Sequence, residues 1–281
     1  MESAQDKYLA NNINSGLVPA QDMSDEIRTK VMPMAPTGMT QLCITDGSMT
    51  EANEAAILNA MKSFADKNNI QDWTQMNVLG FDNGYHGTTA ATLSVSNQGV
   101  IDIGVPLCGW KRIPFPRMKY PMSENETENK AAEDRALKAV TEVLAEGNTA
   151  AVIIEPVSLL GNEMATPLFY KALRKITKER GVCLIVDETK TGMGSTCRFW
   201  GHEHWYLDES PDIVTFGGKA GLAGYFAHFD YGCNVVQGEF DHSKIDHFDT
   251  TWRYIQDWSL LEMVSDTSAF LKLELGRISR E

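Results

Sequence analysis

Two short apolar segments, each ending on an ionisable side chain, constrain the fold of this chain more than any other feature. The first, 183–186, ends on Asp187 and continues into a loop that contains glycines. The second, 212–216, is followed by two glycines and Lys219. Short apolar runs bounded by glycine are typical of buried strands, and ligands of open α/β sheets bind beyond the carboxyl ends of the strands. The sequence therefore predicts a crevice that Asp187 and Lys219 both border.

An aspartate and a lysine at the ends of two strands are the pair that a pyridoxal-phosphate site requires. The lysine forms a Schiff base with the cofactor, and the acid keeps the pyridine nitrogen protonated. Matching segments also occur away from this pair, at 35–42, 114–121 and 199–205. On these residues the chain resembles the class III, fold type I pyridoxal-phosphate aminotransferases, in particular the 4-aminobutyrate aminotransferases, over nearly its whole length.

The composition is that of an ordinary globular protein and limits the class of partner. Of 281 residues, 43% are hydrophobic and 22% charged, and the formal net charge is −13. This charge disfavours a nucleic acid or an anionic membrane as partner. No apolar run reaches the roughly 18 residues of a membrane span. The His-x-His spacing at 202–204 lacks a second ligand pair, so no metal site is expected.

The cellular location is indicated only indirectly. The five cysteines include no C-x-x-C pair and indicate a reducing compartment. We see no targeting segment near Met1, whose neighbours carry acids rather than an apolar or arginine-rich stretch. The resemblance implies a mitochondrial location, and without it the expectation is cytoplasmic.

Apolar and amphipathic segments alternate from about residue 40 to residue 220. We expect strands at 42–45, 78–81, 150–156, 183–187, 212–216 and 221–229, and helices from about 48 to 64 and at 123–146, 167–180 and 258–275. This alternation predicts an α/β fold with a doubly wound, mostly parallel sheet. The resemblance identifies it as the large domain of a fold type I enzyme.

We expect three regions: an N-terminal extension (1–35), the pyridoxal-phosphate transferase large domain (36–255) and a terminal helix (256–281). The family pattern is met from about residue 13 and ends with this helix. The resemblance therefore implies that two parts of the family's fold are absent: the N-terminal segment that helps to close the substrate pocket, and the C-terminal small domain with its carboxylate-binding arginine.

The resemblance assigns further cofactor contacts, each of which has a simpler alternative. Gly47 and Ser48 would bind the phosphate at a helix N-terminus, although Ser48 also suits a plain helix cap. Tyr85 would stack on the cofactor ring, with His86 beside it, although a Tyr-His pair in a loop more often only packs. Thr251 would reach the phosphate of a second subunit's cofactor.

Three positions in the expected site depart from the family pattern. Thr88 stands in place of the arginine that binds the substrate carboxylate, and Leu160 replaces the glutamate that gates the two half-reactions. Each lost charge-assisted contact is worth roughly 1.5–3 kcal/mol, so affinity for a small amino acid should be weak. Lys190 replaces a glutamine of the cofactor site, where its cation would pair with the cofactor or with a nearby acid.

Two classes of function follow. In the first, the chain is an aminotransferase that moves an amino group from 4-aminobutyrate or another ω-amino acid to 2-oxoglutarate, with Lys219 as nucleophile and general acid/base. In the second, it is an inactive relative that serves as a structural subunit, in a homodimer or a larger assembly. The candidate contact face consists of Trp252, Trp258, Leu261, Val264, Phe270 and Leu271. The alternative is that the terminal helix folds back onto the sheet.

Overall fold

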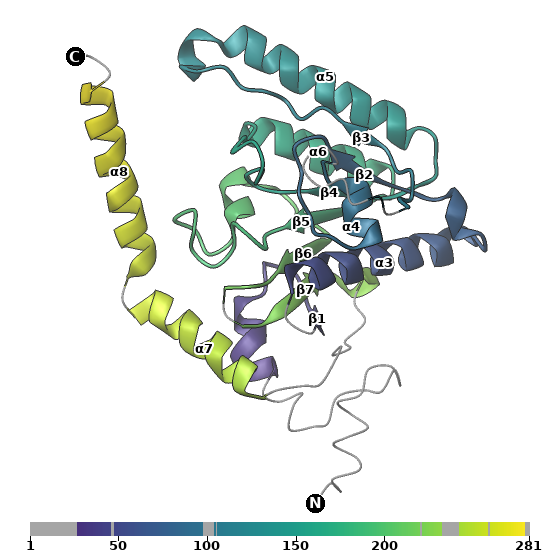
Figure 1. Cartoon of the computed structure of the whole chain (residues 1–281), viewed down its shortest axis with the longest axis horizontal. Helices are drawn as coiled ribbons and strands as arrows, with labels where there is room; N and C mark the ends of the chain where they lie inside the picture. The colour runs from purple at the N-terminus through teal and green to yellow at the C-terminus, as the bar shows by residue number, and fades with distance from the viewer. Residues whose placement is uncertain are drawn as a thin grey trace, which may run out of the picture.

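The structure, a computed structural model, describes residues 27–45, 48–97, 104, 106–219, 221–231, 242–257 and 259–278. A seven-stranded sheet forms the centre of this part of the chain (Figure 1). Its strands are β1 (Gln41–Thr45), β2 (Asn77–Phe81), β3 (Arg112–Ile113), β4 (Thr149–Ile154), β5 (Cys183–Asp187), β6 (Ile213–Phe216) and β7 (Ala223–Ala227).

The strand order is β1-β7-β6-β5-β4-β2-β3, and most neighbours run parallel. The pairs from β3 through β2, β4 and β5 to β6 are all parallel, whereas β7 is antiparallel to both β6 and β1. The predicted mostly parallel α/β sheet is therefore confirmed. Because β4, β5 and β6 share a direction, their carboxyl ends lie along one edge of the sheet.

Six α-helices occur in the described residues: α3 (Met49–Asn68), α4 (Ala90–Val95), α5 (Glu126–Leu144), α6 (Pro167–Glu179), α7 (His242–Asp257) and α8 (Leu260–Ile278). Short helical turns are η2 (Ile27–Val31), η3 (Met32–Met34), η4 (Trp73–Gln75), η5 (Met122–Glu124), η6 (Gly201–Trp205) and η7 (Phe229–Tyr231). None of the helices described is both long and apolar enough to cross a bilayer.

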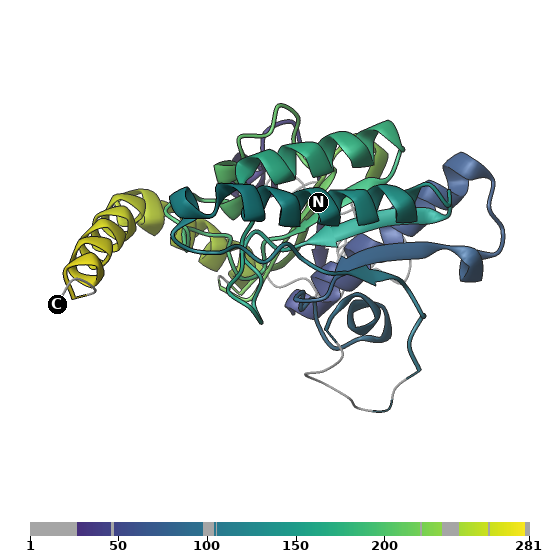
Figure 2. The ribbon, with the colours of Figure 1, turned by 90° about the horizontal axis from the view of Figure 1, so that it is seen from above.

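The helices cover both faces of the sheet, as Figure 2 shows. One buried cluster joins α3 and α4 to the sheet, and a second joins α5, α6 and η6 to the opposite face. Successive strand side chains point to opposite faces. In β5, Cys183 and Ile185 belong to the α3 cluster, while Leu184 and Val186 belong to the other. Asp187 continues the first set, so its carboxylate is directed toward α3.

The structure differs from the expected elements in two places. The segment 108–120, in which no strand was expected, contains β3, which adds a short parallel strand beside β2. A helix that was not predicted, α7, spans 242–257 and buries Phe248 in the main core. The expected boundary at residue 255 falls inside this helix.

Candidate cofactor site

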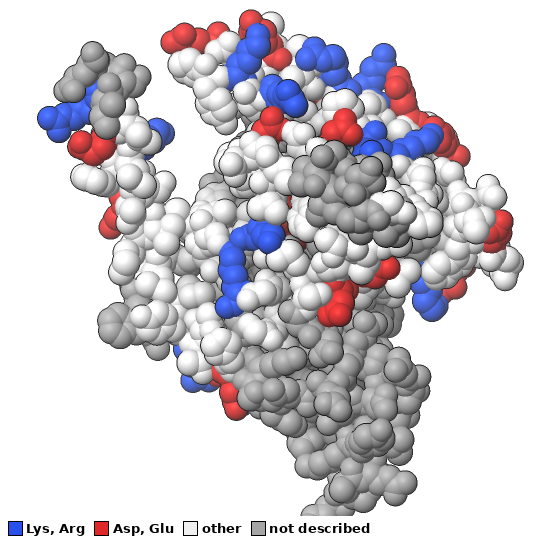
Figure 3. Space-filling view, viewed as in Figure 1, with Lys and Arg blue, Asp and Glu red and all other residues white. Residues whose placement is uncertain are grey.

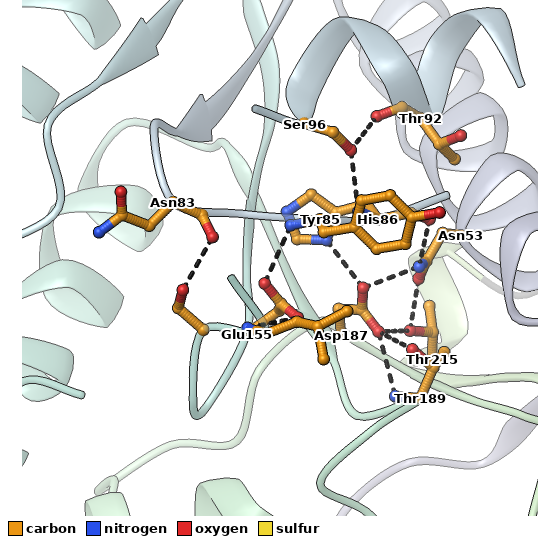
Figure 4. Close-up of polar contacts among 12 residues, drawn as sticks. Asn53, Asn83, Tyr85, His86, Thr92, Ser96, Glu155, Asp187, Thr189 and Thr215 are labelled. Carbon is orange, nitrogen blue, oxygen red and sulfur yellow. Dashed lines mark hydrogen bonds and ion pairs between the residues drawn. The ribbon is translucent and has the colours of Figure 1, made fainter. Parts of the chain in front are cut away.

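Asp187 ends β5 and lies at the centre of a buried hydrogen-bond network (Figure 4). The residue is 1% exposed. Its Oδ2 accepts a hydrogen bond from Asn53 Nδ2 at 2.8 Å and lies 2.7 Å from His86 Nδ1. Its Oδ1 accepts from the backbone N–H of Thr189 at 3.0 Å and from the Thr189 hydroxyl at 2.6 Å. Two donors on each oxygen fill the roughly four acceptor positions of a carboxylate. The Thr215 hydroxyl also lies 3.5 Å from Oδ1, but its shorter hydrogen bond is to Asn53 Oδ1.

These partners keep Asp187 ionised. Burial by itself raises the pKa of Asp187, but the hydrogen bond and charge of His86, together with the Thr189 donors, bring the pKa below its ordinary value. For His86 the pKa shifts upward. Burial lowers the pKa of His86, and the hydrogen bond and charge of Asp187 raise it above its ordinary value. The two side chains therefore form a buried pair in which each favours the charged form of the other.

Asn53 connects the loop after β2 with the ends of β5 and β6. It lies on the buried face of α3, and its Nδ2 donates to the carbonyl of His86 and to Asp187, each at 2.8 Å. Its Oδ1 accepts the Thr215 hydroxyl of β6 at 2.6 Å. Every polar atom of the Asn53 amide is thus engaged, which satisfies the requirement for burying it.

Glu155 directly follows β4, beside the end of β5 that carries Asp187, and it holds the loop that carries Tyr85. Its Oε2 accepts the backbone N–H of Tyr85 at 3.0 Å, and its Oε1 accepts that of Leu159 at 3.3 Å. Burial raises the pKa of Glu155 to about 7, against the opposing charge of His86. The Tyr85 side chain is half-buried. Among the described residues, His86 Nε2 has no hydrogen-bond partner.

Lys219 follows β6 and reaches the loop that follows Asp187. Its Nζ donates to the carbonyl of Gly192 at 2.7 Å and also contacts the Lys190 carbonyl and the Ser195 hydroxyl. Burial lowers the pKa of Lys219, the charge of Glu188 opposes this, and the charge of Lys190 adds to it, so the pKa lies below its ordinary value. A larger share of the amine is then neutral, as a nucleophile requires.

Ser48 caps α3 in the structure. Its hydroxyl accepts the backbone N–H of Glu51 at 3.1 Å, and its own N–H donates to the Glu51 carboxylate at 3.4 Å. This is a capping box, the simpler of the two roles considered for Ser48. Gly47 lies outside the described residues. The first turn of α3 follows β1, which points the same way as β6, so the helix begins at the sheet edge that carries Asp187.

The family model described as aminotransferase class-III matches residues 4–276. The chain belongs to the class III aminotransferases. The 4-aminobutyrate aminotransferase of Dictyostelium discoideum is 35% identical over 244 residues, which cover 79% of this chain and 49% of that protein. The mitochondrial 4-aminobutyrate aminotransferase of Sus scrofa is 32% identical and covers 78% and 49%. This chain spans about half the length of these relatives.

The solved structures agree on the fold. A lysine aminotransferase from M. tuberculosis superposes with a TM-score of 0.82 at 23% identity, over 98% of this chain and 66% of that one. An omega-transaminase from Thermomicrobium roseum gives a TM-score of 0.78 at 22% identity, over 95% and 62%. The prediction of a fold type I class III aminotransferase is confirmed.

The class III fold brings only some of the predicted site residues together. Four of them lie along one edge of the sheet: Tyr85 and His86 in the loop after β2, Asp187 at the end of β5, and Lys219 just after β6. Thr251 lies within α7, where its hydroxyl donates to the His247 carbonyl at 2.8 Å. A helical hydroxyl satisfied in this way is not directed at the site of its own chain.

Lys190 does not pair with an acid in the part of the chain that the structure describes, and its pairing with the cofactor stays a prediction. Its half-buried side chain forms no ion pair there, and its charge acts instead on Lys219. Both neighbouring acids already have partners. Asp187 is occupied by the network above, and Glu188 accepts the Thr191 hydroxyl and lies 2.8 Å from the His202 ring.

Four residues of the class III site were missed by sequence reasoning: Asn53, Glu155, Thr189 and Thr215. Two of them left a local signal. Asn53 interrupts an otherwise apolar face of α3, and Thr189 stands two positions after an aspartate, where Asx turns form. Glu155 comes directly after an apolar run, as Asp187 does, so its position at a strand end could also have been recognised from the sequence. Nothing local distinguishes Thr215 from an ordinary strand threonine.

The donor set fits pyridoxal phosphate. A pyridinium nitrogen requires a carboxylate that stays ionised while buried, and the lowered pKa of Asp187 meets this requirement. The aldehyde requires an amine of lowered pKa, which Lys219 supplies on the neighbouring strand. The N-terminus of α3, at the same sheet edge, favours a phosphate.

Proposed function

We propose that this chain binds pyridoxal phosphate between Asp187 and Lys219 and acts as an aminotransferase of the 4-aminobutyrate type, with an ω-amino acid as donor and 2-oxoglutarate as acceptor. The observation that carries the proposal is the ionised, buried carboxylate of Asp187 on the strand next to that of Lys219. Bound pyridoxal phosphate supplies an electron sink. Asp187 would hold the proton of the ring nitrogen, and Lys219 would move a proton at the substrate carbon.

The substrate class is the least constrained part of the proposal. It comes from the names of the relatives, because Thr88 and Leu160 are both exposed and neither can pair with a carboxylate. The location is likewise a prediction. The pig relative is named as mitochondrial, whereas the Dictyostelium relative is not.

Absorbance of the purified chain tests the cofactor site. With added pyridoxal phosphate we expect a visible band that borohydride bleaches, and mass mapping should then place the pyridoxyl group on Lys219. Lys219→Ala should lose both signals. Lys175→Ala is the matched control, since this lysine lies exposed on α6 and pairs with Glu179 of the same helix, and it should keep them. A wild-type chain with no band and no modified lysine would refute the proposal.

A second candidate, an inactive subunit of a dimer or larger assembly, is favoured by α8. This helix runs away from the sheet in Figure 1, and its surface is largely uncharged in Figure 3. Exposed apolar side chains on it are Met263, Val264, Phe270, Leu271, Leu273 and Leu275. Patches of this kind mark protein interfaces more often than free surface.

A further inference from the structure

The acceptor positions of Asp187 are already full without a ligand. Asn53 and His86 occupy Oδ2, and the N–H and hydroxyl of Thr189 occupy Oδ1. A pyridinium N–H would be a fifth donor to a carboxylate that accepts about four. One of the present donors has to give up or share its position when such a ring binds.

The four donors differ in how easily they can leave. Asn53 is tied to the His86 carbonyl and to Thr215, so moving its amide would break three buried hydrogen bonds. The His86 ring is itself buried, and its Nδ1 lies 2.7 Å from Asp187, so moving it would leave a second buried nitrogen without a partner. The Thr189 N–H is part of the backbone. The Thr189 hydroxyl is the exception, because it turns about a single bond and its one donor contact is with Asp187.

We propose that the hydroxyl of Thr189 competes with the ring nitrogen of pyridoxal phosphate for Oδ1 of Asp187, and thereby sets the affinity of this chain for its cofactor. The inference rests on the proposed function and adds a positioning residue to its site. Thr189 is 3% exposed, so no water stands in for the hydroxyl when it turns away. The hydroxyl also helps to lower the pKa of Asp187, so its removal makes the carboxylate a stronger acceptor for a pyridinium.

Thr189→Val tests the competition, because valine keeps the shape of threonine and its backbone N–H but removes the hydroxyl. We expect the Kd for pyridoxal phosphate, from titration of the visible band, to fall roughly three- to tenfold. The melting temperature of the cofactor-free protein should fall by roughly 2–6 °C, because a charge-assisted hydrogen bond is lost. A merely structural hydroxyl would not raise the affinity for the cofactor while lowering the stability of the cofactor-free protein.

Two further variants control for the substitution itself. Thr191→Val removes a buried hydroxyl from the same loop, but one that donates to Glu188, so its Kd should stay at the wild-type value. Thr189→Ser keeps the hydroxyl and should also keep the wild-type Kd.

The outcomes separate this inference from the proposed function. If the wild-type chain binds and Thr189→Val binds equally or more weakly, the competition is refuted while the cofactor site stands. If only Thr189→Val binds, the competition is supported and the proposed function fails for the native chain. If neither the wild-type chain nor Thr189→Val binds pyridoxal phosphate at any concentration, both the competition and the proposed function are refuted.

Discussion

Glu155 and Asp187 occupy equivalent positions at the ends of adjacent strands, yet their carboxyl groups behave differently. Asp187 receives side-chain donors and the charge of His86, which outweigh burial and lower its pKa. Burial and the charge of Asp187 raise the pKa of Glu155 to about 7, because the charge of His86 and two backbone N–H groups do not offset them. The number and charge of the donors, rather than the residue type, decide which acid is ionised.

This difference predicts a pH dependence of stability. The pKa of Glu155 is about 7 in the folded chain and near its ordinary value of 4.5 when unfolded, so the folded state binds more protons between these values. The free energy of unfolding should therefore fall as pH rises through this window, by at most about 3 kcal/mol from this group. Glu155→Gln should flatten that part of the profile, which denaturant unfolding from pH 4.5 to 8 would measure.

Glu163→Gln provides the control for this prediction. Glu163 lies on the same loop and contacts Asn83, a residue of the loop that carries Tyr85, without touching the Tyr85 N–H. Its variant should keep the wild-type slope. An unchanged slope in Glu155→Gln would show that the folded and unfolded pKa values of Glu155 do not differ.

At the scale of elements, the antiparallel strand β7 fits between β1 and β6 only because one of its residues lacks a side chain. Gly224 pairs with Ile44 of β1 and Phe216 of β6. A Cβ at Gly224 would collide with the backbone carbonyl of Cys43. The close approach is between two backbones, so no rotamer change relieves it.

Gly224→Ala should therefore separate β1 from the rest of the sheet. We expect a loss of about 3 kcal/mol or more in the free energy of unfolding, measured by urea denaturation. Gly276→Ala, in α8, is the control. A Cβ there meets nothing within 4 Å, and alanine favours a helix by up to about 1 kcal/mol, so stability should stay equal or rise slightly. Equal stability of the two variants would contradict the close packing of β1 on β7.

At the scale of the whole molecule, the structure divides the predicted contact face. Trp252 packs edge-on against Phe199 with ring centroids 4.4 Å apart, and Leu261 is partly buried against the main core. These two residues belong to packing within the chain, and Trp258 lies outside the described residues. Phe270 and Leu271 remain exposed, at 61% and 52%. The second half of α8 is thus the part of the predicted face that stays open.

If this part of α8 forms a contact between copies, a charge placed in it should weaken the assembly. We expect Phe270→Glu to shift the molar mass from light scattering toward that of a single chain, with at least a tenfold weaker association. Ser265→Glu adds the same charge at an exposed polar position of the helix and should leave the mass unchanged. A wild-type chain that is monomeric at high concentration would contradict the interaction role.

From local patterns alone, six of the seven strands, the class of the sheet and the positions of Asp187 and Lys219 at strand ends could be predicted. These follow from local patterns: apolar runs of strand length, helix caps and glycine-bounded turns. The antiparallel direction of β7 was not among them, since apolar content does not encode strand direction.

Only the tertiary structure decided what Asp187 contacts. Asn53 lies 134 residues from Asp187 in the chain, and Thr215 lies 162 residues from Asn53. Their meeting depends on how α3 packs on the sheet and on the register of β5 and β6, neither of which has a local pattern. Local patterns place a side chain on an element, whereas its hydrogen-bond partners, and with them its charge, are set by packing between distant segments.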